Sequence, residues 1–123
     1  MATVRYIVHD VDDAVSFYTT HLGFTVVMQA PAGFAMLERE ELRLLLNQPG
    51  AGAAGHPDDA GRLPEPGGWN RFQVVVSDLD GTLAALRDAD VRVRTGAVAG
   101  GGGRQVVIED PSGNAVELLQ PPA

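Results

Sequence analysis

The segment EDPSGNAVELLQ, residues 109–120, contains one carboxylate, Glu117, among apolar residues that follow a turn. A carboxylate in such surroundings can ligate a metal ion, act as a general acid or base, or pair with a cation. The sequence has no cysteine, which excludes disulfides, thiolate catalysis and cysteine-based zinc sites. The histidines, His9, His21 and His56, are expected at a strand end, at a helix end and in a loop, so none is expected to complete a metal site.

Composition and charge narrow the possible partners. The chain has 123 residues, which is close to the usual size of one globular domain. Its net charge of −7 leaves no basic stripe, so we expect no nucleic-acid partner. The N-terminal segment MATVRYIVHDVDD turns acidic before any long apolar run develops. We therefore expect no signal peptide, no membrane span and a cytoplasmic location.

The residues that could do chemistry must be positioned by strands and helices, and the first half of the chain predicts one helix and four strands. Apolar residues at helical spacing from Val11 to Leu22 predict a helix, with Asp10 or Asp12 as its N-cap and Gly23 as its stop. Alternating or β-branched segments predict strands at 3–8, 24–29, 33–39 and 41–47. The Gly- and Pro-rich segment 48–69 is predicted to be a loop, which can be a lid, a binding loop or a simple connection.

The second half repeats the first. Val8–Asp12 falls on Val76–Asp80 at a constant offset, and Tyr18 then falls on Leu86. A strand at 70–76, a helix at 77–90 and a strand at 91–95 are predicted, followed by a glycine-rich link at 96–103 and strands at 104–110 and 115–120. The chain is therefore predicted to be a tandem pair of strand–helix–three-strand units, which must pack together or pair with another chain to bury both faces of their sheets.

Two segments carry a family resemblance. VDDAVSFYTTHLGF in the first half and EDPSGNAVELLQ at the end resemble the signature segments of the glyoxalase/bleomycin resistance/extradiol dioxygenase family, also called the vicinal oxygen chelate superfamily. The resemblance covers essentially the whole chain. It implies an α+β fold of two tandem βαβββ units whose curved mixed sheets form cups, as a single domain over 1–123. Unit one is expected at about 1–47, the loop at 48–69 and unit two at about 70–120. The resemblance also implies a homodimer.

Metal-dependent members of this family carry His or Gln early in the first strand of each unit and Glu in the last strand. The equivalent positions are taken as Thr3 and Arg71 in the first strands, and Leu44 and Glu117 in the last strands, with LLLNQP overlaid on ELLQPP. A divalent ion needs several deprotonated donors, and neither leucine nor a permanently charged arginine supplies one. We therefore expect no metal and no other cofactor. Arg71 and Glu117 are expected to lie on neighbouring strands, where they can form a structural ion pair or orient a polar ligand.

Strand alternation within the implied cups predicts the residues that face a ligand. The first strand of each unit contributes Thr3, Arg5 and Ile7, and Arg71, Gln73 and Val75. The last strands contribute Leu42, Leu44 and Leu46, and Ala115, Glu117 and Leu119. Phe34 and Met36 are expected on the third strand, and Trp69 is either a core anchor for the loop or an aromatic wall that stacks on a flat ligand. The predicted ligand-binding set is Arg5, Phe34, Met36, Leu44, Leu46, Trp69, Arg71, Gln73 and Glu117.

An apolar cup with a few convergent polar groups is typical of a small-molecule pocket. In character the sequence is closest to the metal-free, bleomycin-resistance-like branch, which implies a protein that sequesters an aromatic or drug-like compound. The alternative is an enzyme of the same fold that acts on a small metabolite. Such an enzyme would be a lyase, an isomerase or a cyclase, and a glyoxalase-like enzyme is included. In that case Glu117 is the candidate general acid or base. An interaction module without a ligand is a third alternative.

Overall fold

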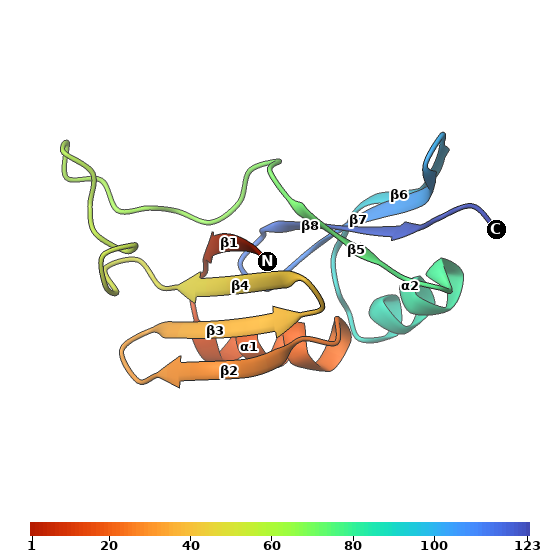
Figure 1. Cartoon of the computed structure of the whole chain (residues 1–123). Helices are drawn as coiled ribbons and strands as arrows, with labels where there is room; N and C mark the ends of the chain where they lie inside the picture. Colours follow the sequence, from red (N-terminus) through yellow and green to blue (C-terminus); the bar gives the residue numbers. More distant parts are fainter. The chain divides into compact units, whose positions relative to one another are not determined.

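The computed structural model describes residues 1–123, which divide into two compact units, residues 1–67 and 68–123. Each unit contains one helix and four strands in the order βαβββ (Figure 1). The predicted fold class, two tandem βαβββ units with mixed sheets, is therefore confirmed. No helix in the chain is both long enough and apolar enough to cross a bilayer. The elements are β1 (Ala2–Ile7), α1 (Val11–His21), β2 (Thr25–Ala30), β3 (Phe34–Arg39), β4 (Leu42–Asn47), β5 (Phe72–Val75), α2 (Leu79–Asp88), β6 (Val93–Gly100), β7 (Gly103–Glu109) and β8 (Ala115–Gln120).

Unit one is a four-stranded sheet in the order β1-β4-β3-β2 with α1 against one face (Figure 1). β1 and β4 run parallel, and the other neighbours are antiparallel. The apolar stripe of α1 meets alternate residues of the strands, as the periods of helix and strand require. This face forms the core of the unit, whose buried apolar residues include Tyr6, Val8, Val11, Ala14, Tyr18, Leu22, Phe24, Ala35, Leu37, Leu44 and Leu46.

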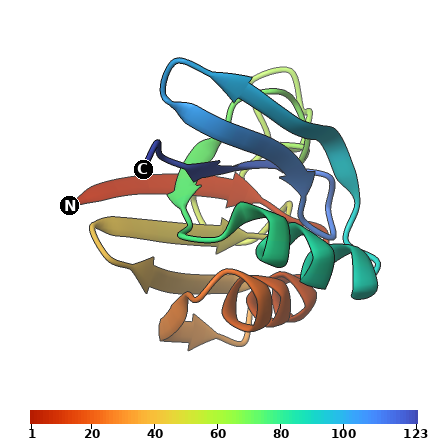
Figure 2. The same ribbon diagram turned by 90° about the vertical axis from the view of Figure 1, so that its right-hand side faces the viewer.

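Unit two repeats this arrangement with the order β5-β8-β7-β6 and α2 (Figure 2 shows both helices from another side). Its core includes Phe72, Val74, Leu79, Leu86, Val106, Ile108, Val116 and Leu118. The helices start alike, because the side chain of Asp10 accepts a hydrogen bond from the N–H of Asp13 and that of Asp78 accepts one from Gly81. Of the two N-caps that the sequence allowed for the first helix, the structure has Asp10.

At the start of each helix, a residue distant in sequence accepts a hydrogen bond from a further backbone N–H group. The side-chain oxygen of Gln48 accepts a hydrogen bond from the N–H of Val11 at 3.0 Å, and that of Gln120 accepts one from Leu79 at 2.8 Å. Helix N–H groups in the first turn have no partner within the helix, so a side-chain acceptor removes a buried unsatisfied donor. Gln48 and Gln120 therefore occupy equivalent positions at the ends of the last strands of the two units.

The glycine-rich link predicted at 96–103 is mostly strand instead. β6 extends to Gly100, and Gly101 and Gly102 alone form the turn into β7. The two-residue turn leaves the ladder intact up to the Gly100–Gly103 pair. Gly103 has φ +124°, and a Cβ there would meet the carbonyl oxygen of Gln120 at 2.2 Å. A side chain is therefore excluded at this position by both conformation and space.

The predicted loop 48–69 contains no helix or strand, but its first part is compact. The N–H of Gly50 donates to the carbonyl of Gly55 at 2.7 Å, and the N–H of Gly55 donates to Ala51 at 3.0 Å. The side chain of Asn47, at the end of β4, donates to the carbonyl of Ala51 at 3.3 Å. This segment is thus folded back on itself and tied to the sheet.

Candidate functional site

The site is built on the face of each sheet that lies opposite its own helix, which we call the helix-free face. Residues directly opposite each other on neighbouring strands share a face. In unit one the strand pairs form three rows on this face: Ile7, Asn47, Phe34 and Ala30; Arg5, Leu45, Met36 and Met28; and Thr3, Arg43, Glu38 and Thr25. Phe34, Met36 and Arg5 thus lie on the face where the sequence places them.

The prediction that Leu44 and Leu46 line the ligand face is wrong, and so is the placing of Leu42 with them. Leu44 pairs with Val4 and Leu46 pairs with Tyr6, and both leucines are fully buried on the helix side. The error is a slip of one residue, which moves a whole strand's side chains to the opposite face because the period of a strand is two. Leu45 lies on the helix-free face in their place.

The equivalence of the two halves also differs from the prediction by one residue in the last strands. In unit two, Gln73 pairs with Glu117, as Arg5 pairs with Leu45 in unit one. The residue equivalent to Glu117 is therefore Leu45, and the correct overlay places LLNQP on ELLQP. The shared Gln-Pro was the signal in the sequence that could have set this register.

In unit one the helix-free face combines apolar side chains with two hydrogen-bonded polar pairs, Arg5–Asn47 and Arg43–Glu38. The guanidinium of Arg5 donates a hydrogen bond to the side-chain oxygen of Asn47, and no carboxylate pairs with Arg5. Arg43 is held by Glu38 through its Nε and Nη2, at 3.0 and 2.9 Å. The middle row, in which Arg5 is followed by Leu45, Met36 and Met28, offers polarisable apolar area beside a cation.

In unit two the middle row contains the acid that stands out in the sequence. Arg71 donates from Nε to one oxygen of Glu117 at 3.0 Å, and Gln73 donates from Nε2 to the other at 2.6 Å. The Glu117 side chain is only 12% exposed, so the expected ion pair is present in a sheltered setting. Both carboxylate oxygens are engaged, and each keeps a lone pair that can accept one further hydrogen bond.

Trp69 lies two residues before Arg71 and contacts two arginines. The carbonyl oxygen of Trp69 accepts a hydrogen bond from Arg71 Nη1 at 3.4 Å, which links it to the Glu117 pair. The guanidinium carbon of Arg94 lies 4.6 Å from the centroid of the indole ring. The residue is 65% exposed, so the alternative of a buried core anchor for the loop is wrong. Ligand contact by Trp69 remains a prediction.

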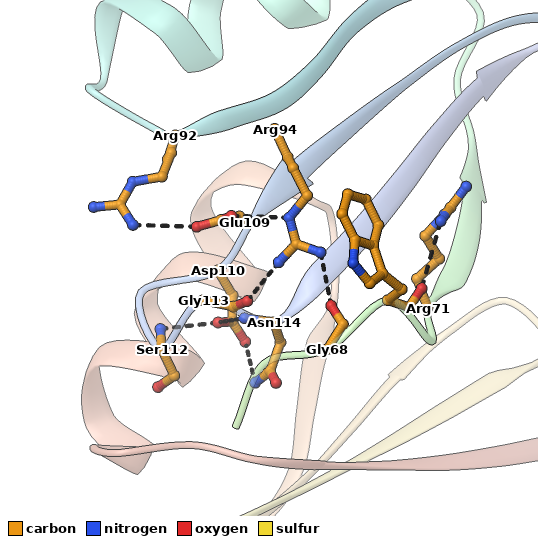
Figure 3. Close-up of polar contacts among 10 residues, drawn as sticks. Gly68, Arg71, Arg92, Arg94, Glu109, Asp110, Ser112, Gly113 and Asn114 are labelled. Atoms are coloured by element: carbon orange, nitrogen blue, oxygen red, sulfur yellow. Dashed lines mark hydrogen bonds and ion pairs between the residues drawn. The ribbon is translucent and has the colours of Figure 1, made fainter. Parts of the chain in front are cut away.

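Arg94 and Glu109 are the site residues that the sequence did not single out. Arg94 donates to Glu109 at 2.9 Å, to the carbonyl of Gly68 at 2.7 Å and to the carbonyl of Gly113 at 2.9 Å (Figure 3). Arg92 also donates to Glu109, at 3.2 Å. The alternating arginines of VRVRT were the available signal, but their partners lie 15 to 26 residues away in sequence.

The turn that opens the last strand contains several hydrogen bonds among its own residues. The buried carboxylate of Asp110 accepts from the N–H groups of Ser112 and Asn114, both at 2.9 Å, and from the Asn114 side chain at 3.0 Å (Figure 3). These contacts involve the polar residues Asp110, Ser112 and Asn114 of the segment EDPSGN. The turn precedes β8 and presents the Gly113 carbonyl to Arg94.

The residues at the family's metal positions do not fit a metal ion. With the corrected register these are Thr3, Leu45, Arg71 and Glu117. Leucine has no donor atom, the arginine cation repels a divalent ion, and Glu117 already serves Arg71 and Gln73. No group of three or more His, Asp or Glu side chains anywhere in the chain is gathered closely enough to hold one.

An open hollow of about 690 Å³ lies elsewhere in unit one, between the start of α1 and the β2–β3 turn. Gln29 donates to Asp12 at 2.7 Å across it, and Gln48 lines it while capping α1. None of the predicted ligand-binding residues lines this hollow.

Comparisons with known proteins agree with the fold. The profile of the Glyoxalase/Bleomycin resistance protein/Dioxygenase superfamily matches residues 1–118, which confirms the resemblance. No curated protein matches the sequence. A lactoylglutathione lyase from Agrobacterium tumefaciens is similar, with 22% identity, 98% of this chain and 92% of that chain covered, and a TM-score of 0.74. TnmS3, an antibiotic binding protein from a Streptomyces species, shares 23% identity over 98% of this chain and 93% of its own, with a TM-score of 0.69. TioX from a Micromonospora species shares 21% identity, with 98% and 97% covered and a TM-score of 0.70.

Proposed function

Because this chain belongs to the Glyoxalase/Bleomycin resistance protein/Dioxygenase superfamily, we propose that it is a metal-independent protein that binds and sequesters an aromatic or drug-like small molecule. Each helix-free face is a candidate ligand surface by itself: that of unit one offers Arg5, Phe34 and Met36, and that of unit two offers Trp69 and the Arg71–Gln73–Glu117 group. A role of the antibiotic self-resistance type follows from such binding, because sequestration lowers the free concentration of a toxic compound.

The observation that carries this proposal is the state of Glu117. Its two oxygens are taken up by Arg71 and Gln73 at 3.0 and 2.6 Å, so the one acid in the middle rows is held as part of a polar surface. Such a fixed group orients a ligand by its remaining hydrogen-bonding capacity and needs no chemical step. A small-molecule site needs apolar contact area and a few fixed polar groups that set orientation, and the Glu117 group is of the second kind.

The alternative function is an enzyme of this fold, a lyase, isomerase or cyclase that acts on a small metabolite. Its support is the sheltered position of Glu117, whose side chain is 12% exposed and lies on the proposed ligand face. A ligand that donated to Glu117 in place of Gln73 would put a general base within reach of a proton.

We also propose that the chain works as a single cytoplasmic domain and as a homodimer. The support for pairing is the edge strand β2, where Val26, Val27 and Met28 are 44%, 52% and 49% exposed. Exposed apolar residues on a sheet edge favour association with another chain. Size-exclusion chromatography with light scattering measures the mass directly, and the monomer mass at all concentrations contradicts the homodimer.

A ligand screen tests the main proposal. Trp69 is the only tryptophan, so tryptophan fluorescence, excited where the tyrosines do not absorb, reports on unit two alone. Planar aromatic antibiotics and metabolites should raise the melting temperature, because a ligand that binds only the folded state stabilises it, and they should quench Trp69. Mass spectrometry should recover the bound compound unchanged. Conversion of the compound that Glu117→Gln abolishes would replace sequestration by the enzyme alternative, and stoichiometric bound metal would refute metal independence.

A further inference from the structure

Trp69 is an exposed aromatic side chain that the structure nevertheless fixes in place. Its ring lies against Arg94. Arg94 donates a hydrogen bond to the carbonyl of the preceding residue, Gly68, and Arg71 donates one to the carbonyl of Trp69. With 65% of the residue exposed, the indole contributes little to the core. An apolar group that is both exposed and held in place has the features of a contact surface.

Arg94 is more firmly held than a surface arginine. Nε, Nη1 and Nη2 each have a fixed partner, respectively Glu109, Gly68 and Gly113, at 2.7 to 2.9 Å (Figure 3). The side chain is only 16% exposed. The planar guanidinium therefore cannot turn away, and its charge stays on one side of the indole.

A fixed cation on one side of an aromatic ring alters the other side. The guanidinium attracts the π density of the indole, which makes the side of the ring opposite Arg94 less negative than in a free tryptophan. We infer that Arg94 is a specificity-determining residue, which makes the exposed Trp69 ring select neutral, electron-rich planar rings over cationic ones. This inference rests on the proposed function, because it presumes that a planar compound stacks there.

Paired probes test the inference. A dihydroxynaphthalene is neutral and electron-rich, whereas N-methylquinolinium is a cation of the same two-ring shape. Equilibrium dialysis gives both dissociation constants without relying on the Trp69 signal. Arg94→Gln should shift the ratio of the two constants toward the cation by roughly three- to tenfold, the size of a cation–π contribution.

Arg87→Gln is the matched control, since it removes the same charge from the end of α2, where the arginine has no ion-pair partner. In this variant the ratio of the two dissociation constants should stay at the wild-type value. The comparison thus separates the local effect of Arg94 from the effect of the net charge of the chain. Trp69→Leu changes an exposed residue, so it leaves the core intact, and it should remove the preference by weakening both probes to a common level.

The possible outcomes are distinct. Equal ratios in Arg94→Gln and Arg87→Gln, with both probes bound, overturn the inference and leave the proposed function standing. A ratio that Trp69→Leu does not alter also overturns the inference. Failure of both probes to bind the wild-type protein counts against the proposed function for planar compounds, and the inference falls with it.

Discussion

Replacement of Gln120 by leucine should destabilise unit two through a single unsatisfied donor. The side-chain oxygen of Gln120 accepts the hydrogen bond of the Leu79 N–H at 2.8 Å, at the start of α2. Leu79 is fully buried, so water cannot take the place of the lost acceptor. Leucine has a similar volume and lacks the oxygen, which makes the change specific to the hydrogen bond.

The size of the effect follows from the cost of a buried polar group without a partner. Leaving one backbone N–H unsatisfied costs about 1 to 3 kcal/mol, and we expect about 2 kcal/mol here. With a urea m value of about 2 kcal/mol per molar, the unfolding midpoint should fall by about 1 M with an unchanged slope.

Urea unfolding followed by circular dichroism measures this midpoint. Gln120→Glu keeps an acceptor oxygen at the helix start, where a negative charge is favourable, so it should lose much less stability than the leucine variant. Gln48→Leu, which removes the equivalent bond to Val11 in unit one, should behave like Gln120→Leu. A leucine variant with the wild-type midpoint would refute the argument that these glutamines stabilise the helix starts.

Three further outcomes can be measured. Leu44→Ala should cost about 2 to 5 kcal/mol in unfolding free energy because Leu44 is fully buried, whereas Leu45→Ala on the helix-free face should cost less, and the reverse order would contradict the register. Gly55→Ala should lower the melting temperature, because a Cβ there would meet backbone atoms at 2.4 to 2.6 Å, and an unchanged value would contradict the compact loop. The hydrogen bond and then the charge of Arg104 lower the pKa of Asp80, so this pair stabilises the folded state at neutral pH and ceases to do so as the pH falls through the lowered value. The difference in melting temperature between wild type and Asp80→Asn should therefore shrink below pH of about 4, and a difference independent of pH would contradict this.

Much of the fold could be predicted because its signals are local. The helical spacing from Val11 onward and the alternation in the strands identify each element from its own residues. The repeat offset then pairs Asp10 with Asp78, and both are N-caps in the structure. The glycine-rich stretch at 96–103 predicts a link because glycine weakens a strand, and only the ladder with β7 shows that β6 continues to Gly100.

The site was predicted only in part, because it depends on register. Leu44, Leu45 and Leu46 are chemically alike, so composition cannot say which of them faces the helix. A shift by one residue reverses the answer, and the burial of Leu44 and Leu46 decides it.

By itself the sequence determined the tandem βαβββ architecture, the unsuitability of its residues for the family's metal site, and the expectation that Arg71 and Glu117 form a pair. The architecture needs only residue types and spacing, whereas the metal positions and the Arg71–Glu117 pair also depend on the family resemblance. The tertiary structure decided which leucines lie on the helix-free face, and it brought Gln73 to Glu117 and Arg94 to Trp69. Those contacts join residues 25 to 44 positions apart, and only the folded chain sets distances of that kind.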